Sequence, residues 1–490
     1  MLLLFLLAGG STTFAGSATW KAAPATGDWN TAANWTPPTV PNSSADTATF
    51  ATSNITGVSL SAITQLNSIV FNPGASAFTI TDNSFAFTIG GTGIMNNSTA
   101  LQNLVAGVDG AGGNGTLNFT SSATAGTATI FTSAPAPSGG QGGLLQFHNS
   151  STADRSTIIN NGSSVTQTFG GTTVFFDTSS AGTSAITNNG GNGVGQGGGV
   201  LLFIDSSTAA GATLTCNAGL GGVGASIQFK VDTTGGTARI ILSGNGELQI
   251  AEHNPPGLTT GSIEGNGEVF LAANNLTVGS NNLTTTFSGV IQDGDEGIGG
   301  SLTKMGTGTL TLTGPNTYTG STTITGGTLL VKNRRGSGTG TGPVNANVGT
   351  LGGTGTIAGA VTVGMGSGPG AVLAPGVKAA PGTLTIQGAL TFNATATYAV
   401  NLKTTTSAAD KVVANGVTIA SNAQFSFLPA GHFAIPSGTV FTLIDNTAAT
   451  PIAGVFSNLP DGVTFFANGN SFHVNYEGGD GNNLTLTVVP

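Results

Sequence analysis

The sequence predicts an all-β protein, a single-stranded parallel β-helix (a solenoid) with an N-terminal cap and a β-rich C-terminal end. Three observations predict this fold class. Only 6% of the 490 residues are charged, against about 25% in an average globular domain. The chain holds 80 glycines, and they punctuate short runs of Thr, Val, Ile and Leu, as in strands joined by tight turns. Apolar side chains also recur at a fixed spacing in the middle of the chain.

Residues 1–18 are predicted to be a segment like a secretory signal peptide. Leu2 to Ala8 form a short apolar run, and small residues follow it, as in the apolar region and cleavage zone of such signals. Cleavage is predicted after Ala15 or Ala18. The run is too short for a membrane-spanning helix, and no other stretch reaches 18 apolar residues, so no transmembrane segment is expected. The mature chain is expected to be exported.

Residues 19–99 are predicted to form the N-terminal cap and the first strands. All three tryptophans of the chain, Trp20, Trp29 and Trp35, lie there. One interpretation is a platform on which sugar rings stack. The other is an apolar plug over the first coil, because the open end of a β-helix exposes unpaired strand edges. The plug is favoured, since the terminal repeats of solenoids usually act as caps.

Residues 100–430 are predicted to form the β-helix, and 28-residue repeats within 117–246 are its clearest signal. Two apolar columns two residues apart define one face of a strand, so like side chains in every repeat indicate coils stacked in parallel with inward ladders. The asparagine column predicts a turn with amides bonded along the stack. The columns are Phe119, Phe147, Phe175, Phe203 and Val231; Leu117, Leu145, Thr173, Leu201 and Phe229; Ile130, Ile158, Ile186 and Leu214, with Ile241 one residue short; and Asn161, Asn189, Asn217 and Asn245.

Residues 300–331 have the same strand alternation with shorter coils. Leu310 and Leu312 are predicted to face inward, and the threonines between and beside them outward. Lys304 interrupts an otherwise apolar run and is expected to point outward. Residues 431–490 are predicted to form the β-rich C-terminal segment.

The stretch 300–331 also resembles the autotransporter-associated β-strand repeat, called the passenger-associated transport repeat. The matching pattern is Gly300, Leu302, Lys304, Gly306, Gly308, Thr309, Leu310, Leu312, Gly314, Asn316, Thr317, Tyr318, Gly320, Thr322, Ile324, Gly327, Thr328 and Leu329. The tryptophan-rich N-terminal segment and the C-terminal FSNLPDGVTF and YEGGDGNNLTLT resemble the two ends of proteins with this repeat. The resemblance implies a right-handed β-helix of a bacterial surface or secreted protein, and it brings no catalytic residues with it.

Asp177, Asp205 and Asp232 form a near-column, spaced by 28 and 27 residues. Carboxylates on one face of a β-helix serve polysaccharide hydrolases and lyases as acid/base pairs or calcium ligands. A Ser or Thr follows each aspartate, however, which favours a turn in which the carboxylate binds backbone amides. The acidic loop from Asp293 to Glu296 is likewise expected to be a solvated turn rather than a calcium site.

The charge balance of −9, from 20 acidic and 11 basic residues, argues against nucleic acid as a partner. Lys332, Arg334 and Arg335 form the only basic cluster, expected at an exposed corner. The single cysteine, Cys216, excludes an internal disulfide framework and is expected to be a small buried hydrophobe. No cofactor and no metal site are predicted.

The favoured function is a non-enzymatic bacterial stalk, a passenger-like protein on the surface or secreted, with adhesion and coat formation as its candidate roles. Extracellular polysaccharide and cell-surface components are the candidate partners, and the oligomeric state is left open. Two alternatives belong to other classes. One is a polysaccharide-degrading β-helix enzyme, a lyase or a hydrolase. The other is carbohydrate binding through the N-terminal tryptophans.

Overall fold

The computed structural model describes residues 16–109, 111–137, 139–376, 381–403, 408–428, 434–467 and 469–490. Leu2, Ala8 and Ala15 of the signal-like segment lie outside these residues. Within them the protein has no α-helix, and its one short helix is the 3-10 helix η1 (Ala32–Asn34). The strands form a parallel β-solenoid of about 15 turns, which confirms the predicted fold class. The chain divides into two compact units, unit 1 (Met1–Thr208 with Gly219–Ala225) and unit 2 (Ala209–Ala218 with Ser226–Pro490).

Unit 1 contributes strands to two sheets, in which successive coils pair in parallel. The exception is the antiparallel pair β1–β2 at the N-terminal edge. The first sheet holds β2 (Trp35–Thr36), β1 (Ala18–Trp20), β3 (Ser43–Phe50), β5 (Thr64–Phe71), β7 (Ala86–Asn96), β9 (Thr116–Phe119), β11 (Leu144–Phe147), β13 (Thr172–Phe175) and β15 (Val200–Phe203). The second holds β4 (Gly57–Ser59), β6 (Thr79–Thr81), β8 (Gln102–Ala106), β10 (Thr127–Ser133), β12 (Arg155–Asn160) and β14 (Ala185–Asn188).

The 28-residue repeat sets the register of β9, β11, β13 and β15, as predicted. Leu145 is aligned with Leu117 on one side and Thr173 on the other. The phenylalanine rings of β9, β11, β13 and β15 stack with centroid distances of 5.0, 4.6 and 5.0 Å and nearly parallel planes. In the asparagine column, Asn189 donates its amide N–H to Asn161 Oδ1 over 3.3 Å. In the phenylalanine column each coil therefore covers its neighbour with an identical ring.

The third predicted column is wrong at its first member. Phe131, and not Ile130, is aligned with Ile158, and Phe131 is the buried residue of the two. The pairing of β10 with β12 shifts register between Thr127 and Ile130, and Ala128 has a φ of +54°. A bulge of this kind inserts an extra residue, which moves the following side chains to the other face.

Unit 2 begins with a shorter coil. Two predicted columns, those that end at Ile241 and at Val231, are therefore wrong at their last member. Leu214 is aligned with Ile240, 26 residues on, and Ile241 is not its partner. Val231 is 38% exposed and has a φ of +60°, so it lies at a corner and not in an inward ladder. The buried residue that ends the neighbouring strand is Phe229.

The strands of unit 2 lie in three sheets. The first contains β17 (Ser226–Phe229), β19 (Glu247–Gln249), β21 (Glu268–Phe270) and β24 (Val290–Gln292). The second contains β16 (Thr213–Cys216), β18 (Gly235–Leu242), β20 (Gly257–Gly265), β22 (Asn275–Val278), β23 (Thr285–Phe287), β25 (Ser301–Lys304), β26 (Thr309–Leu312), β27 (Thr322–Ile324), β28 (Thr328–Val331), β29 (Val344–Ala346), β30 (Gly349–Gly353), β32 (Val361–Val363), β33 (Ala371–Pro375), β35 (Leu390–Phe392), β36 (Ala396–Lys403), β37 (Ala408–Ala409), β39 (Val417–Ile419) and β40 (Gln424–Leu428). The third contains β31 (Thr356–Ile357), β34 (Thr383–Ile386), β38 (Lys411–Ala414), β41 (Val440–Asn446), β44 (Asn483–Val489), β43 (Asn470–Gly478) and β42 (Thr464–Ala467).

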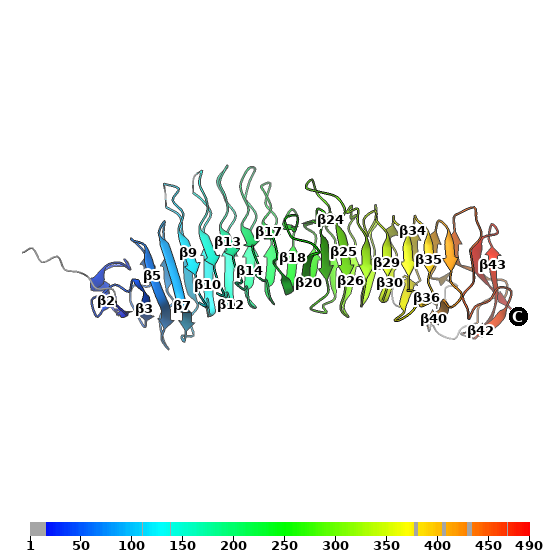
Figure 1. Ribbon diagram of the computed structural model, residues 1–490, viewed down its shortest axis with the longest axis horizontal. Coiled ribbons are helices and arrows are strands. Elements are labelled where there is room, and N and C mark those ends of the chain that lie inside the picture. Colours follow the sequence, from blue (N-terminus) through cyan, green and yellow to red (C-terminus); the bar gives the residue numbers. More distant parts are fainter. Residues whose placement is uncertain are drawn as a thin grey trace, which may run out of the picture. The chain divides into compact units, whose positions relative to one another are not determined.

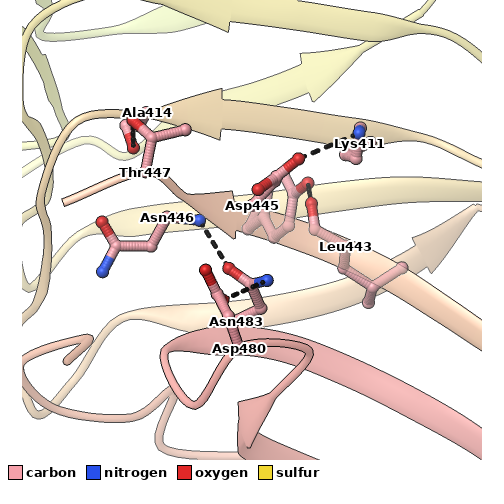
Figure 2. Close-up of polar contacts among 9 residues, drawn as sticks. Lys411, Ala414, Leu443, Asp445, Asn446, Thr447, Asp480 and Asn483 are labelled. Atoms are coloured by element: carbon pink, nitrogen blue, oxygen red, sulfur yellow. Dashed lines mark hydrogen bonds and ion pairs between the residues drawn. The ribbon is translucent and has the colours of Figure 1, made fainter. Parts of the chain in front are cut away.

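The third sheet changes from parallel to antiparallel pairing near the C-terminus, where β41, β44, β43 and β42 follow the parallel strand β38. Figure 1 shows β42 and β43 in red at this end of the chain. Polar contacts fasten this antiparallel end. Lys411 Nζ lies 3.1 Å from Asp445 Oδ2, and the Asn446 N–H donates to Asn483 Oδ1 over 2.8 Å (Figure 2). The parallel stack thus passes into an antiparallel sheet through side chains that bridge neighbouring strands.

Candidate functional site

Asp177 and Asp205 lie together on the surface of unit 1, at one corner of successive coils. Both are exposed, with φ values of +55° and +61°. Asp205 Oδ2 accepts the backbone N–H of Asp177 over 3.1 Å, and Asp177 Oδ2 accepts that of Asn149 over 2.7 Å. Asn149 Oδ1 in turn accepts the N–H of Ser121 over 3.0 Å. The amide oxygen of Asn149 accepts a backbone N–H just as the two carboxylates do. The turn therefore needs an oxygen acceptor at this position and no negative charge.

Asp232 belongs to unit 2 and takes part in a different contact. Its exposed carboxylate accepts from Asn254 Nδ2 over 2.8 Å. The structure thus brings two of the three predicted aspartates together and gives the third another partner.

The three tryptophans form a buried cluster at the N-terminal edge of unit 1. Their side chains are 0–1% exposed. Trp35 meets Trp20 and Trp29 edge to face, with ring centroids 5.0 and 4.9 Å apart. Each indole N–H donates to a backbone carbonyl, that of Trp20 to Ile55 O over 3.2 Å, for example. Rings packed in this way present no exposed face to a sugar, and their geometry is that of an apolar plug.

Lys304 lies inside unit 2, which contradicts the outward orientation expected from the sequence. It is 1% exposed and occupies an inward column between Val278 and Ile324. Strand alternation places it on the same face as Leu302 of β25. Its ammonium group donates to Met305 O over 2.6 Å and to Gly326 O over 3.3 Å. Burial lowers the pKa of Lys304 to about 8, because the low-dielectric interior disfavours the charged form.

Two further polar residues of the same segment, Asn316 and Tyr318, are buried and hydrogen-bonded. Asn316 Oδ1 accepts the N–H of Ile291 over 2.8 Å, and Asn316 Nδ2 donates to Gly338 O over 2.6 Å. The buried hydroxyl of Tyr318 lies 2.5 Å from the Thr322 hydroxyl, and burial raises the pKa of Tyr318. Asn316 therefore links its own coil to the coil before and the coil after. Its partners lie 25 and 22 residues away in the chain.

Asp82 is a buried acid that the sequence analysis missed. It is 1% exposed, and burial raises its pKa to about 8. Asp82 Oδ1 accepts the N–H of Gly107 over 2.7 Å, whereas Oδ2 has no hydrogen-bond partner among the described residues. Perturbed acids often mark catalytic sites, but a group sealed from solvent cannot touch a polymeric substrate. The available signal was an acid placed directly after the strand-like run ending at Thr81.

The acidic loop after β24 was expected to be a solvated turn, but its first aspartate is buried and hydrogen-bonded. Asp293 is buried, and its carboxylate accepts the backbone N–H and the hydroxyl of Thr319 and the N–H of Gly299. It therefore fixes the neighbouring loops instead of being solvated. Asp295 and Glu296 line a small hollow of about 180 Å³ beside it. Across the described residues, no three His, Cys, Asp or Glu side chains gather in a way that could hold a metal ion.

Comparison with known proteins identifies the segment that contains Lys304, Asn316 and Tyr318. Residues 302–331 match the family model of the passenger-associated transport repeat. No curated protein matches the chain. The described residues include no apolar helix of membrane-spanning length. Residues 302–331 thus match a passenger-associated transport repeat within a parallel β-solenoid, and the two findings together support a passenger-like β-helical protein.

Proposed function

We propose that the chain is a non-enzymatic scaffold of a bacterial cell surface or its extracellular medium, with adhesion or coat formation as its role. The observation that carries the proposal is the use of the polar residues in the repeat. Lys304 and Asn316 are buried, and their side chains form hydrogen bonds with the backbone of their own and neighbouring coils. The segment that identifies the chain therefore stabilises the stack and presents no reactive group of its own to solvent.

The exposed aspartates support the same proposal. Asp177 and Asp205 hold the turns of successive coils through backbone N–H groups. A retaining or inverting glycosidase needs two carboxyl groups that flank the scissile bond with different protonation states. Carboxylates that repeat with the coil period and continue a column begun by the amide of Asn149 fit a turn ladder better than an acid/base pair.

Export is part of the proposal, and the structure favours one of the two cleavage positions. The Ser17 hydroxyl oxygen accepts the N–H of Thr47 over 2.9 Å, and Ala18 pairs with Ala48 in the first sheet. Cleavage after Ala15 keeps both contacts, whereas cleavage after Ala18 removes them. Mass spectrometry of the mature N-terminus is expected to give Gly16 as the first residue, and a start at Thr19 would contradict this choice.

The test for enzymatic activity is a polysaccharide screen with the purified chain. Each reaction is assayed for new reducing ends and for new unsaturated sugar ends, which report hydrolases and lyases respectively. The proposal expects neither. New ends that disappear in Asp205→Asn, while the same change at Asp445 leaves them, would make the chain a β-helix enzyme. Depletion of the protein by an insoluble glycan, lost in Trp29→Phe but not in Phe466→Ala, would instead favour binding at the tryptophan plug.

A further inference from the structure

A basic corner follows strand β28 in unit 2, and it stands out in a chain with few charges. Lys332, Arg334 and Arg335 lie within four residues and account for three of the 11 basic residues in the sequence. Both arginines are exposed, and Lys332 is partly exposed. We call these three residues the basic corner.

The backbone of the basic corner is fixed by a buried amide. Asn333 is 5% exposed. Its Oδ1 accepts the N–H of Thr356 over 2.9 Å, and its Nδ2 donates to Arg335 O over 3.1 Å and Gly336 O over 2.8 Å. Gly336 completes the turn with a φ of +64°, a conformation that favours glycine. Asn333 thus points inward and holds the turn, while Arg334 and Arg335, the two residues after it, are exposed to solvent.

The basic corner lines an open hollow that crosses three coils. Val331 is aligned with Leu312 and with Gly353, so the residues that follow them, Thr313, Lys332 and Thr354, form one column along the stack. At about 4.8 Å per coil the column spans roughly 10 Å. The hollow has a volume of about 900 Å³, and Arg334, Arg335 and Thr356 complete its basic and hydroxyl lining.

The charge of the basic corner is uncompensated within the described residues. No acidic side chain lines the hollow. In that part of the chain none of the three bases forms an ion pair, whereas Lys230, Arg239 and Lys411 each pair with a carboxylate. Unpaired bases in a concave site focus a positive potential even on a protein of net charge −9. Such a site attracts anions.

We propose that the basic corner binds an acidic polysaccharide. A guanidinium group holds a carboxylate through two parallel hydrogen bonds, so Arg334 and Arg335 would each hold one acidic group. Lys332 adds a point charge to the same hollow, and the threonine hydroxyls meet sugar hydroxyls. No aromatic ring lines the hollow, which disfavours nucleic acid bases, since these stack on such rings. The lining also has no large apolar side chain to insert into a lipid surface.

This inference goes beyond the scaffold function, and its test in solution does not depend on where the chain resides in the cell. The purified chain is titrated with polygalacturonate, dextran sulfate and neutral dextran, at low and at high salt. Binding to one or both anionic polymers, weakened by salt, with none to dextran, is expected. The preferred polymer then tells whether the acidic group is a carboxylate or a sulfate. A failure to bind either anionic polymer at low salt overturns the proposal, and so does equal binding to dextran.

The site is tested with a matched pair of double variants. Arg334→Gln with Arg335→Gln removes two charges from the hollow, and Lys230→Gln with Arg239→Gln removes two from elsewhere in unit 2. The first pair is expected to weaken binding by about tenfold or more, and the second to change it less than about twofold. Equal losses would show a general charge effect and overturn the site. Arg334→Lys with Arg335→Lys keeps the charge and is expected to lose part of the affinity, because lysine cannot form the paired bonds.

Two further ligands decide against other partner classes. A short DNA duplex and vesicles of phosphatidylcholine with phosphatidylglycerol are titrated under the same conditions. Weaker binding of both than of the acidic polysaccharide is expected. Tighter binding of either, lost in the double arginine variant, would assign the basic corner to nucleic acid or to a membrane and overturn the polysaccharide proposal.

Discussion

Asp82→Asn is expected to stabilise unit 1 at neutral and alkaline pH and to leave it nearly unchanged at pH 4. The carboxyl group of Asp82 is buried at the end of β6, with one oxygen bonded to Gly107 and the other without a partner among the described residues. Burial raises its pKa from 3.8 to about 8. The folded protein therefore holds a proton there that the unfolded chain has already released at pH 7. The neutral amide of asparagine has nearly the same shape and releases no proton.

The sign and size of the effect follow from proton linkage. Because the folded pKa is raised, the contribution of Asp82 to stability is complete below pH 3.8 and is lost as pH rises from about 4 to about 8. With these two pKa values the loss between pH 4 and pH 7 is about 4 kcal/mol, as an upper limit. The variant escapes this loss. Its advantage in free energy of unfolding should therefore grow by up to that amount between pH 4 and pH 7, grow a little further as pH approaches 8, and level off above pH 8.

Guanidinium unfolding followed by tryptophan fluorescence measures this advantage in unit 1, because Trp20, Trp29 and Trp35 all lie there. The control is Asp109→Asn. Hydrogen bonds, the largest from the N–H of Gly113, lower the pKa of the Asp109 carboxyl at the surface. A lowered pKa gives the wild type a stabilisation that is lost only as pH falls below about 4, so Asp109→Asn is expected to differ from the wild type by a nearly constant amount from pH 5 to pH 9. An advantage of Asp82→Asn that is constant from pH 4 to pH 9 would refute the reasoning, and so would a variant less stable than the wild type at pH 9.

Three other substitutions test the ladders and the repeat. Phe147→Ala opens the ring stack of unit 1 and should lower the free energy of unfolding by about 3–5 kcal/mol. Val194→Ala, at a side chain 80% exposed, should change it by less than about 0.5 kcal/mol. Equal effects in denaturant titrations would show that the ring stack does not stabilise unit 1. Asn316→Ala leaves a buried N–H and a buried carbonyl without their partner, so a loss of about 2–4 kcal/mol is expected, with faster amide exchange at Ile291 as the local measurement. Burial lowers the pKa of Lys304 from 10.5 to about 8, so its unfavourable contribution is complete below pH 8 and is relieved as pH rises to 10.5; the stability of the wild type relative to Lys304→Met should therefore rise by up to about 3 kcal/mol in that window, and a flat difference in thermal unfolding would contradict it.

The fold was predictable because a stacked coil repeats its own sequence. Phe119, Phe147, Phe175 and Phe203 could be aligned by counting 28 residues, and the rings stack as that count requires. Counting 28 residues gave the wrong alignment where a coil has one residue more or two residues fewer. The bulge near Ala128 and the 26-residue step from Leu214 to Ile240 leave the composition unchanged and move side chains to another position.

The buried polar residues were the harder part of the prediction. Lys304 was expected outside because a lone ammonium in an apolar ladder is costly. Only the folded backbone shows that Met305 O and Gly326 O are within reach of Nζ. Asp82 belongs to no repeat column and no motif of the sequence. Its carboxylate is held by a residue 25 positions further along the chain. Contacts of this kind between coils are not visible in a local pattern.

The measurement that tests the central claim most directly is the location of the chain in intact cells of its native host. Cells are treated briefly with protease, and released peptides are identified beside those of the culture medium and of lysed cells, with a cytoplasmic protein as the control for leakage. A passenger-like extracellular scaffold should give peptides of residues 16–490 from intact cells or from the medium, while the cytoplasmic control stays protected. Peptides that are found only after lysis, together with the cytoplasmic control, would contradict the account.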